Sequence, residues 1–189
     1  MFDATVSVID DTVRARLSAS WRPGCPVPLE ALRLLQLTYW DGAAARSGEL
    51  MVHHDHADAI VAVFRRLFEI RFPIARMELV DIYGGDDRRS MQANNTSAFN
   101  CRQVDGSPGV LSQHAYGAAV DVNPLVNPWV RGEVVDPPEG RPYADRTQRV
   151  TGGIYAGDEV IAAFASVGWS WGGNWTTSKD YQHFSANGR

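Results

Sequence analysis

Two amphipathic helical segments and several short apolar runs predict an α+β fold. Residues 55–70 and 158–167 each place apolar side chains on one stripe at helical spacing, and Gly168 is suited to end the second helix. Short segments rich in apolar residues at 49–53, 77–83 and 118–122 are typical of strands. Helices and short strands therefore share one chain without a regular alternation.

The composition is that of an ordinary globular domain. The chain has 189 residues, of which 44% are hydrophobic and 21% charged, so one domain is expected. A net charge of -4 provides no basic surface of the kind that nucleic-acid binding needs. We find no run of the roughly 20 apolar residues that a membrane span requires, and the first residues lack the pattern of a signal peptide.

The N-terminal quarter of the chain predicts an arm, residues 1–48, packed on a domain of residues 49–189 within one globular unit. Residues 21–28 are rich in proline, which excludes regular structure there. Residues 29–40 suit a short helix or an extended segment, with a strand favoured in the second half. Cys25 and Cys101 are either one disulfide or two buried thiols.

Two long irregular segments and one histidine cluster require separate interpretation. Residues 84–102 form a long polar stretch that carries Arg88, Arg89 and Arg102, and a loop of this length usually has a function. Residues 125–153 are rich in Pro and Gly and predict either a substrate-side flap or surface padding. His53, His54 and His56 suggest a metal, but their position at a strand-to-helix corner favours capping and solvation instead.

The first strong metal-ligand candidates lie between residues 112 and 121. Gly117 permits a tight bend after His114, and the apolar run 118–122 predicts a short buried strand that presents Asp121. A buried carboxylate is costly unless it is paired or metal-bound. Asp121 therefore needs a cation.

The second set of candidates lies near the C-terminus. Asp180 precedes His183 by three residues, so in a turn or helix its carboxylate lies beside a metal bound by His183. His114, Asp121 and His183 would leave a fourth position for water, as catalytic zinc sites do. Asp180 suits the role of general base, and an arginine from residues 84–102 can stabilise an oxyanion.

The two stretches resemble the motifs of a known enzyme family. The sequence SQHAYGAAVD, residues 112–121, resembles the S-x-H-x-x-G-x-A-x-D signature of the zinc D-alanyl-D-alanine carboxypeptidases, a family that includes L-alanyl-D-glutamate endopeptidases. Residues 180–183 resemble its second motif, an acid, two spacers and His. Residues 168–175 resemble its G-W-x-W-G-G-x-W run, although core positions are expected for at least two of the three tryptophans. The resemblance covers roughly residues 50 to 184 and includes the 90–102 segment.

The resemblance implies a hedgehog/DD-peptidase-like fold, in which a small antiparallel sheet flanked by helices holds a zinc site. It implies Zn²⁺ on His114, Asp121 and His183, with Asp180 as the base, where the family often has Glu. Arg102 is the preferred catalytic arginine because it lies just upstream of Ser112, whereas Arg88 and Arg89 match the family's Tyr-Arg-Ser type motif imperfectly. Ser112 is expected to bind substrate or brace the site.

The implied function is a zinc metallopeptidase that hydrolyses peptidoglycan stem peptides with metal-activated water, as a D-Ala-D-Ala carboxypeptidase or an L-Ala-D-Glu endopeptidase. The alternative is a non-catalytic, zinc-stabilised domain of the same fold that binds cell wall or protein. Asp180 beside an open coordination position favours the enzyme. The expected protein is a monomer that works extracellularly, in the periplasm or at the cell wall, with an endolysin-like phage route as one means of export.

Overall fold

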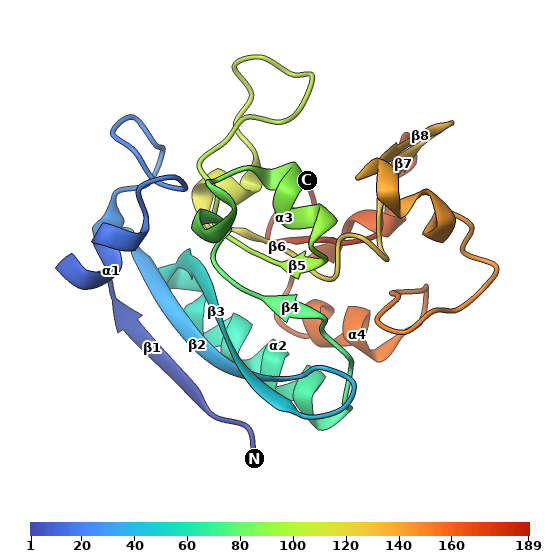
Figure 1. The fold of residues 1–189 in the computed structure, drawn as a ribbon, viewed down its shortest axis with the longest axis horizontal. Helices are drawn as coiled ribbons and strands as arrows, with labels where there is room; N and C mark the ends of the chain where they lie inside the picture. Colours follow the sequence, from blue (N-terminus) through green and yellow to red (C-terminus); the bar gives the residue numbers. More distant parts are fainter.

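A computed structural model describes residues 1–189 as helices surrounding three small antiparallel sheets and one short parallel pair (Figure 1). This architecture agrees with the predicted α+β class. The α-helices are α1 (Asp11–Arg16), α2 (Ala57–Glu69), α3 (Asp87–Gln92) and α4 (Glu159–Ala165). The strands are β1 (Ala4–Val8), β2 (Leu32–Trp40), β3 (Ala45–His53), β4 (Arg76–Met77), β5 (Asn95–Thr96), β6 (Ala119–Asp121), β7 (Trp129–Arg131), β8 (Val134–Asp136), β9 (Ser170–Trp171), β10 (Lys179–Asp180) and β11 (His183–Ser185). None of the helices has the length and apolar character needed to cross a membrane.

The N-terminal sheet has the order β1-β2-β3. Strands β2 and β3, of nine residues each, form an antiparallel hairpin. The segment 29–40, whose sequence suits a short helix or an extended segment, is a 3₁₀ turn at Leu29–Ala31 followed by β2. The boundary predicted between residues 48 and 49 lies inside β3. The N-terminal segment thus contributes two strands and the start of a third to one continuous sheet.

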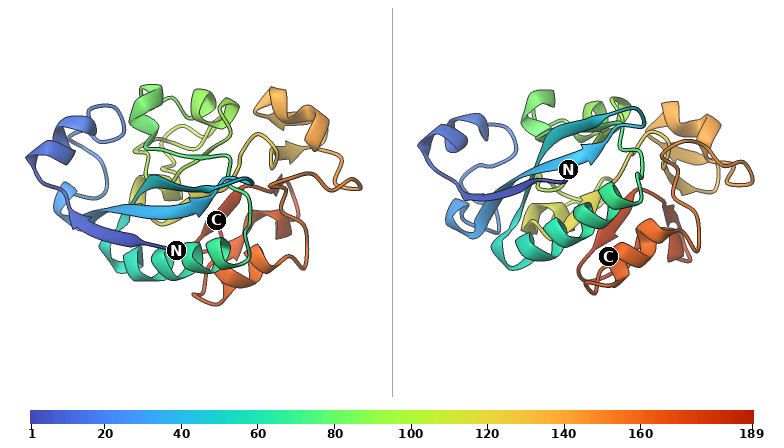
Figure 2. Two further views of the ribbon diagram at one scale, coloured as in Figure 1. Left: turned by 60° about the horizontal axis from the view of Figure 1, so that its bottom comes forward. Right: turned by 90° about the horizontal axis from the view of Figure 1, so that it is seen from below.

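Helices α2 and α4 match the two predicted amphipathic segments. Helix α2 covers one face of the N-terminal sheet, and α4 lies beside α2 (Figure 2). Ile60, Val63 and Phe64 on α2 are at most 1% exposed because the apolar stripe faces the core. Phe164 on α4 stacks on Phe184 of β11 with ring centroids 3.8 Å apart. This contact connects the helices to the strand that carries His183.

The structure contradicts the prediction of a strand at 77–83. Only Arg76–Met77 forms a strand, and Val80–Tyr83 is a 3₁₀ turn that ends at Gly84 in a left-handed conformation. The Asp81 carboxylate accepts the main-chain N–H groups of Ala19 and Ser20, and these hydrogen bonds to a distant part of the chain hold Asp81 in the turn. Apolar residues alone did not distinguish a strand from a buried turn.

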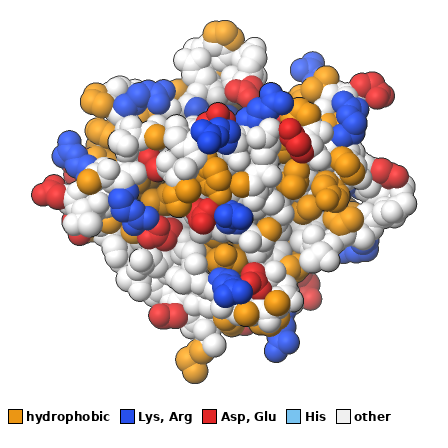
Figure 3. Space-filling model, viewed as in Figure 1, with side chains coloured by type: hydrophobic (Ala, Val, Ile, Leu, Met, Phe, Trp, Pro, Cys, Tyr) orange, Lys and Arg blue, Asp and Glu red, His pale blue; other side chains and the backbone are white.

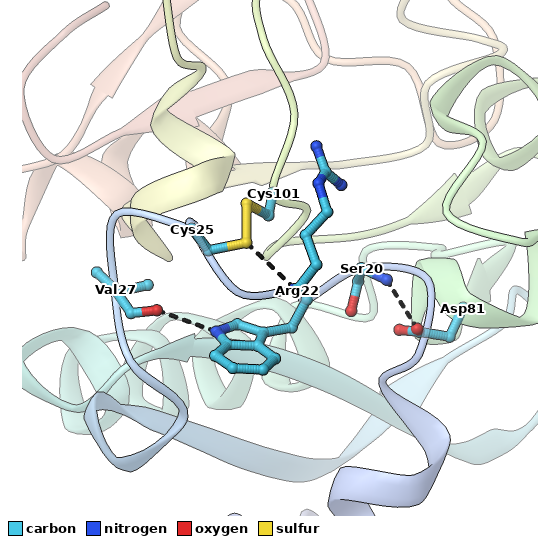
Figure 4. Close-up of a disulfide and its surroundings, with 7 residues drawn as sticks. Ser20, Arg22, Cys25, Val27, Asp81 and Cys101 are labelled. Carbon is cyan, nitrogen blue, oxygen red and sulfur yellow. Dashed lines mark hydrogen bonds between the residues drawn. A yellow bond between two sulfur atoms is a disulfide. The ribbon is translucent and has the colours of Figure 1, made fainter.

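The polar segment 84–102 contains more regular secondary structure than the predicted loop. It contains α3, which begins where the Asp86 side chain accepts the N–H of Arg89, and the short strand β5. Near the end of the same segment, Cys101 forms a disulfide with Cys25 (Figure 4). Of the two alternatives for the cysteines, the structure contains the disulfide.

The disulfide connects the N-terminal segment to the site-bearing half of the chain. Trp21 donates its Nε1–H to the carbonyl of Val27. The main-chain N–H of Ser20 donates to the Asp81 carboxylate (Figure 4). A second apolar cluster surrounds these contacts and includes Leu17 and Phe99. The loop before β2 is therefore held covalently and by packing.

We predict that Cys25→Ser lowers the free energy of unfolding by about 4 kcal/mol, because the disulfide joins two residues that are 76 positions apart in sequence and so closes a long loop. In a protein of this size the melting temperature falls by about 10 °C. Calorimetry of oxidised, reduced and mutant protein measures the effect. Equal melting temperatures for the oxidised and the reduced wild-type protein would contradict the prediction.

Candidate metal centre

Three chain segments bring His114, Asp121 and His183 together. Asp121 ends β6 and lies directly opposite His183, the first residue of β11, in the antiparallel pair. His114 lies on the 3₁₀ turn Gln113–Tyr116, where the Ser112 hydroxyl accepts the His114 N–H at 3.3 Å. All three side chains are buried, with 3%, 4% and 6% of each residue exposed in chain order. Their candidate ligand atoms lie within 4.8 Å of one another.

Gly117 allows the His114 turn to pack against the end of β3. Its φ of +65° lies in the left-handed region, and a Cβ at this position would lie 2.5 Å from the main-chain nitrogen of His53. The Gly117 carbonyl accepts the N–H of His53 at 3.0 Å. A side chain at 117 would therefore displace the turn that carries His114.

Main-chain carbonyls determine which nitrogen of each imidazole faces Asp121. Nδ1 of His114 lies 2.5 Å from the carbonyl oxygen of Ala98, and Nε2 of His183 lies 3.0 Å from that of Arg189. A carbonyl only accepts hydrogen bonds, so each of these nitrogens carries a hydrogen. The opposite nitrogens point at Asp121, with His114 Nε2 at 3.0 Å from Oδ2 and His183 Nδ1 at 2.9 Å from Oδ1.

This arrangement fits a divalent metal. In neutral imidazoles the two nitrogens that face Asp121 present lone pairs to a carboxylate, and His114 Nε2 has no hydrogen-bond partner. Such a cluster needs either added protons or a cation between the donors. Two neutral imidazoles, each oriented by a hydrogen bond on its outer nitrogen, and one carboxylate are the donor set and orientation found in zinc sites.

The charges within the cluster favour a positive charge on or between its members. Burial opposes ionisation of Asp121, but the two histidines outweigh it and hold the pKa of Asp121 far below its usual range. Burial also opposes a charge on His183, but the hydrogen bond and charge of Asp121 raise its pKa to about 9. Without metal, protons therefore occupy the place that a metal ion would take.

Asp180 lies beside this cluster but is not within it. It belongs to β10 and His183 to β11, so the two residues lie on successive strands instead of on the predicted turn or helix. Its Oδ1 is buried without a hydrogen-bond partner. Burial, with the negative charge of Asp121, raises the pKa of Asp180 to about 7. A carboxyl group with this pKa can exchange protons near neutral pH.

Among the arginines considered, Arg102 lies at the site. It lines a cavity of about 380 Å³ together with His114, Asp121, Asp180 and His183, whereas Arg88 and Arg89 are exposed and do not line it. The Arg102 guanidinium forms an ion pair with Asp87 on α3 at 2.8 Å. Asp87 thus holds the guanidinium at the cavity, a role that the sequence did not indicate.

Segments that looked irregular in sequence supply the cavity walls. Trp129 of β7 and Asp136 of β8 come from the Pro-rich excursion, and Figure 3 shows apolar side chains gathered at the right of the molecule, where Figure 1 places these strands. Trp169 and Trp171 are buried as expected, while Trp175 lines the cavity with its ring 5.4 Å from that of His183. Ser112 also lines it.

The N-terminal histidines do not join this centre. His53 and His54 instead form a separate exposed group with Asp55, whose carboxylate lies 2.9 Å from His54 Nδ1. Gln182, between Asp180 and His183, also lines the cavity, although the sequence motif gives it only the position of a spacer.

We predict that His114→Ala loses the tightly bound metal, because it removes one of three candidate ligands, and that its melting temperature no longer rises when zinc is added. Plasma emission spectroscopy and calorimetry measure the two effects. His54→Ala, a substitution of an exposed histidine outside the centre, serves as the matched control. Equal metal content in the two variants would contradict the assignment of His114.

We predict that metal-free protein is less stable at pH 9 than at pH 6. The pKa of His183 is raised from 6.5 to about 9, so its stabilising contribution is complete below 6.5 and lost as the pH rises to 9. The raised pKa of Asp180 acts in the same direction between about pH 4 and 7. The melting temperature should fall on the order of 5 °C. The melting temperature of zinc-saturated protein should not fall over this pH range. An equal fall for the metal-free and the zinc-saturated protein would contradict the prediction.

Comparison with known proteins supports the resemblance carried by the two motifs. Residues 105–186 match the sequence profile of a family described as D-alanyl-D-alanine carboxypeptidase. No curated protein and no solved structure matches the chain. The matched residues include His114, Asp121, Asp180 and His183. The segment that carries the candidate centre is therefore similar in sequence to the D-alanyl-D-alanine carboxypeptidase family.

Proposed function

We propose that this protein is a zinc-dependent peptidase that hydrolyses peptidoglycan stem peptides, as a carboxypeptidase or an endopeptidase. The observation that carries the proposal is the cluster of His114, Asp121 and His183, with buried Asp180 beside it, at the wall of a cavity. The family match to residues 105–186 supports a peptidase. His114 Nε2, an Asp121 carboxylate oxygen and His183 Nδ1 would hold the metal.

A bound zinc ion would supply Lewis acidity and lower the pKa of water at the site. Asp180 is the proposed general base, because its buried Oδ1 has no hydrogen-bond partner and is free to accept a proton and return it to the leaving amine. Gly172 lets this carboxylate lie close to the centre: a Cβ at 172 would lie 2.9 Å from that of Asp180 and 3.3 Å from that of His183.

Arg102 is proposed to stabilise negative charge that develops on the substrate oxygen or to hold a terminal carboxylate. Its buried Nε has no hydrogen-bond partner, so donor capacity remains after the ion pair with Asp87. Ser112 braces His114 through its hydroxyl oxygen, and its hydroxyl hydrogen is proposed to bind the substrate.

The alternative is a metal-stabilised binding domain without catalysis. It leaves the buried, unpartnered Oδ1 of Asp180 without a role, and a buried polar group without a partner is destabilising. We therefore favour the enzyme.

We also propose that the protein works as a monomer outside the cytoplasm, where the Cys25–Cys101 disulfide would persist.

We predict that Asp180→Asn retains about one metal ion per chain but loses at least about 100-fold in kcat, because the amide cannot accept the proton. Mass spectrometry of digested muropeptides measures the loss and identifies the bond cut. Asp58→Asn on the exposed side of α2 is the control and should keep full activity. Hydrolysis by metal-loaded Asp180→Asn at the wild-type rate would rule out Asp180 as the base.

A further inference from the structure

Buried polar atoms without partners are concentrated at the cavity. Eight buried side-chain nitrogen or oxygen atoms in the chain have no hydrogen-bond partner, and four of them belong to the cavity-lining residues Arg102, His114, Asp180 and Gln182. Native proteins contain few such atoms, so each one calls for a physical explanation. The proposed function accounts for the first three. Gln182 has no role in it.

Gln182 is held firmly in place through its main chain. Its carbonyl accepts the N–H of Val122, the residue after Asp121, at 3.0 Å. The next residue, His183, lies opposite Asp121 in the antiparallel pair of β11 and β6. The residue is only 2% exposed, yet its Oε1 has no hydrogen-bond partner. Gln182 lines the cavity together with Asp180 and His183.

An exclusively structural role does not explain a glutamine here. Burying a carboxamide oxygen without a partner is destabilising, and an apolar side chain of the same length would avoid that cost. The last torsion of glutamine has broad minima, so a small rotation can turn its oxygen or nitrogen toward the cavity. A carboxamide offers both an acceptor and donors, which match the N–H and C=O of a peptide group.

We propose that Gln182 is a substrate-binding residue whose carboxamide hydrogen-bonds a main-chain peptide group of the bound peptide, beside the metal centre. This inference rests on the proposed peptidase function and assigns it a specificity-determining residue. The bound peptide supplies the partner that Oε1 lacks. A substrate of this class must carry an unblocked peptide group close to the bond that is cut.

The test compares Gln182→Met with wild type and with Gln36→Met, a control on the exposed side of β2. Methionine keeps the length of the side chain and removes both hydrogen-bonding atoms. We expect Gln182→Met to keep its metal and to melt at the wild-type temperature or a few degrees higher, while kcat/KM on a stem peptide falls at least tenfold. A lower melting temperature with unchanged kcat/KM would show a structural role and overturn the proposal.

Direct binding separates this proposal from the catalytic one. Calorimetry measures the Kd of the same stem peptide for metal-loaded Asp180→Asn and for Asp180→Asn combined with Gln182→Met, so no hydrolysis is required. We expect the double variant to bind at least tenfold more weakly. Equal Kd values, or no binding by either variant, would overturn the role of Gln182. Weaker binding by the double variant would support that role even if the wild type cut no peptide.

Discussion

The structure depends on the carboxylate of Asp121 lying between two imidazoles whose outer nitrogens are already bonded to carbonyls. Ala98 and Arg189 supply those carbonyls, so neither ring can turn away without losing a hydrogen bond, which is buried for His114 and partly buried for His183. The inner nitrogens then converge on one carboxylate, in a place that protons or a metal ion must neutralise. Main-chain geometry, more than the ligands themselves, prepares this centre for a cation.

The hydrophobic core maintains this geometry from one side. Phe164 of α4 stacks on Phe184 of β11, the residue after His183, and α2 connects α4 to the N-terminal sheet. On another side, Gly117 holds the His114 turn against β3, and the Cys25–Cys101 disulfide ties the N-terminal segment to the strand-like stretch after β5. The N-terminal segment is therefore a structural support of the centre, although it contributes none of its ligands.

The cavity walls come from the parts of the chain that sequence patterns describe least. Asp87 begins α3 in a segment predicted as a loop, and Trp129 and Asp136 lie on a hairpin within a stretch considered as possible padding. Short-range periodicity does not predict these positions, because strands of two or three residues are stabilised by pairing with distant partners. The choice of Arg102 over Arg88 and Arg89 likewise depends on exposure and on one ion pair.

The sequence by itself determined the helices α2 and α4, the α+β class and the family motifs, because helical periodicity and motif spacing are local properties of the chain. It also singled out His114, Asp121 and His183 as candidates. Only the tertiary structure decided that these side chains converge, which nitrogen of each ring faces Asp121, and that Gln182 lies at the cavity with an unpartnered oxygen. Burial and hydrogen bonds between distant segments set these properties, and neither can be deduced from residue spacing.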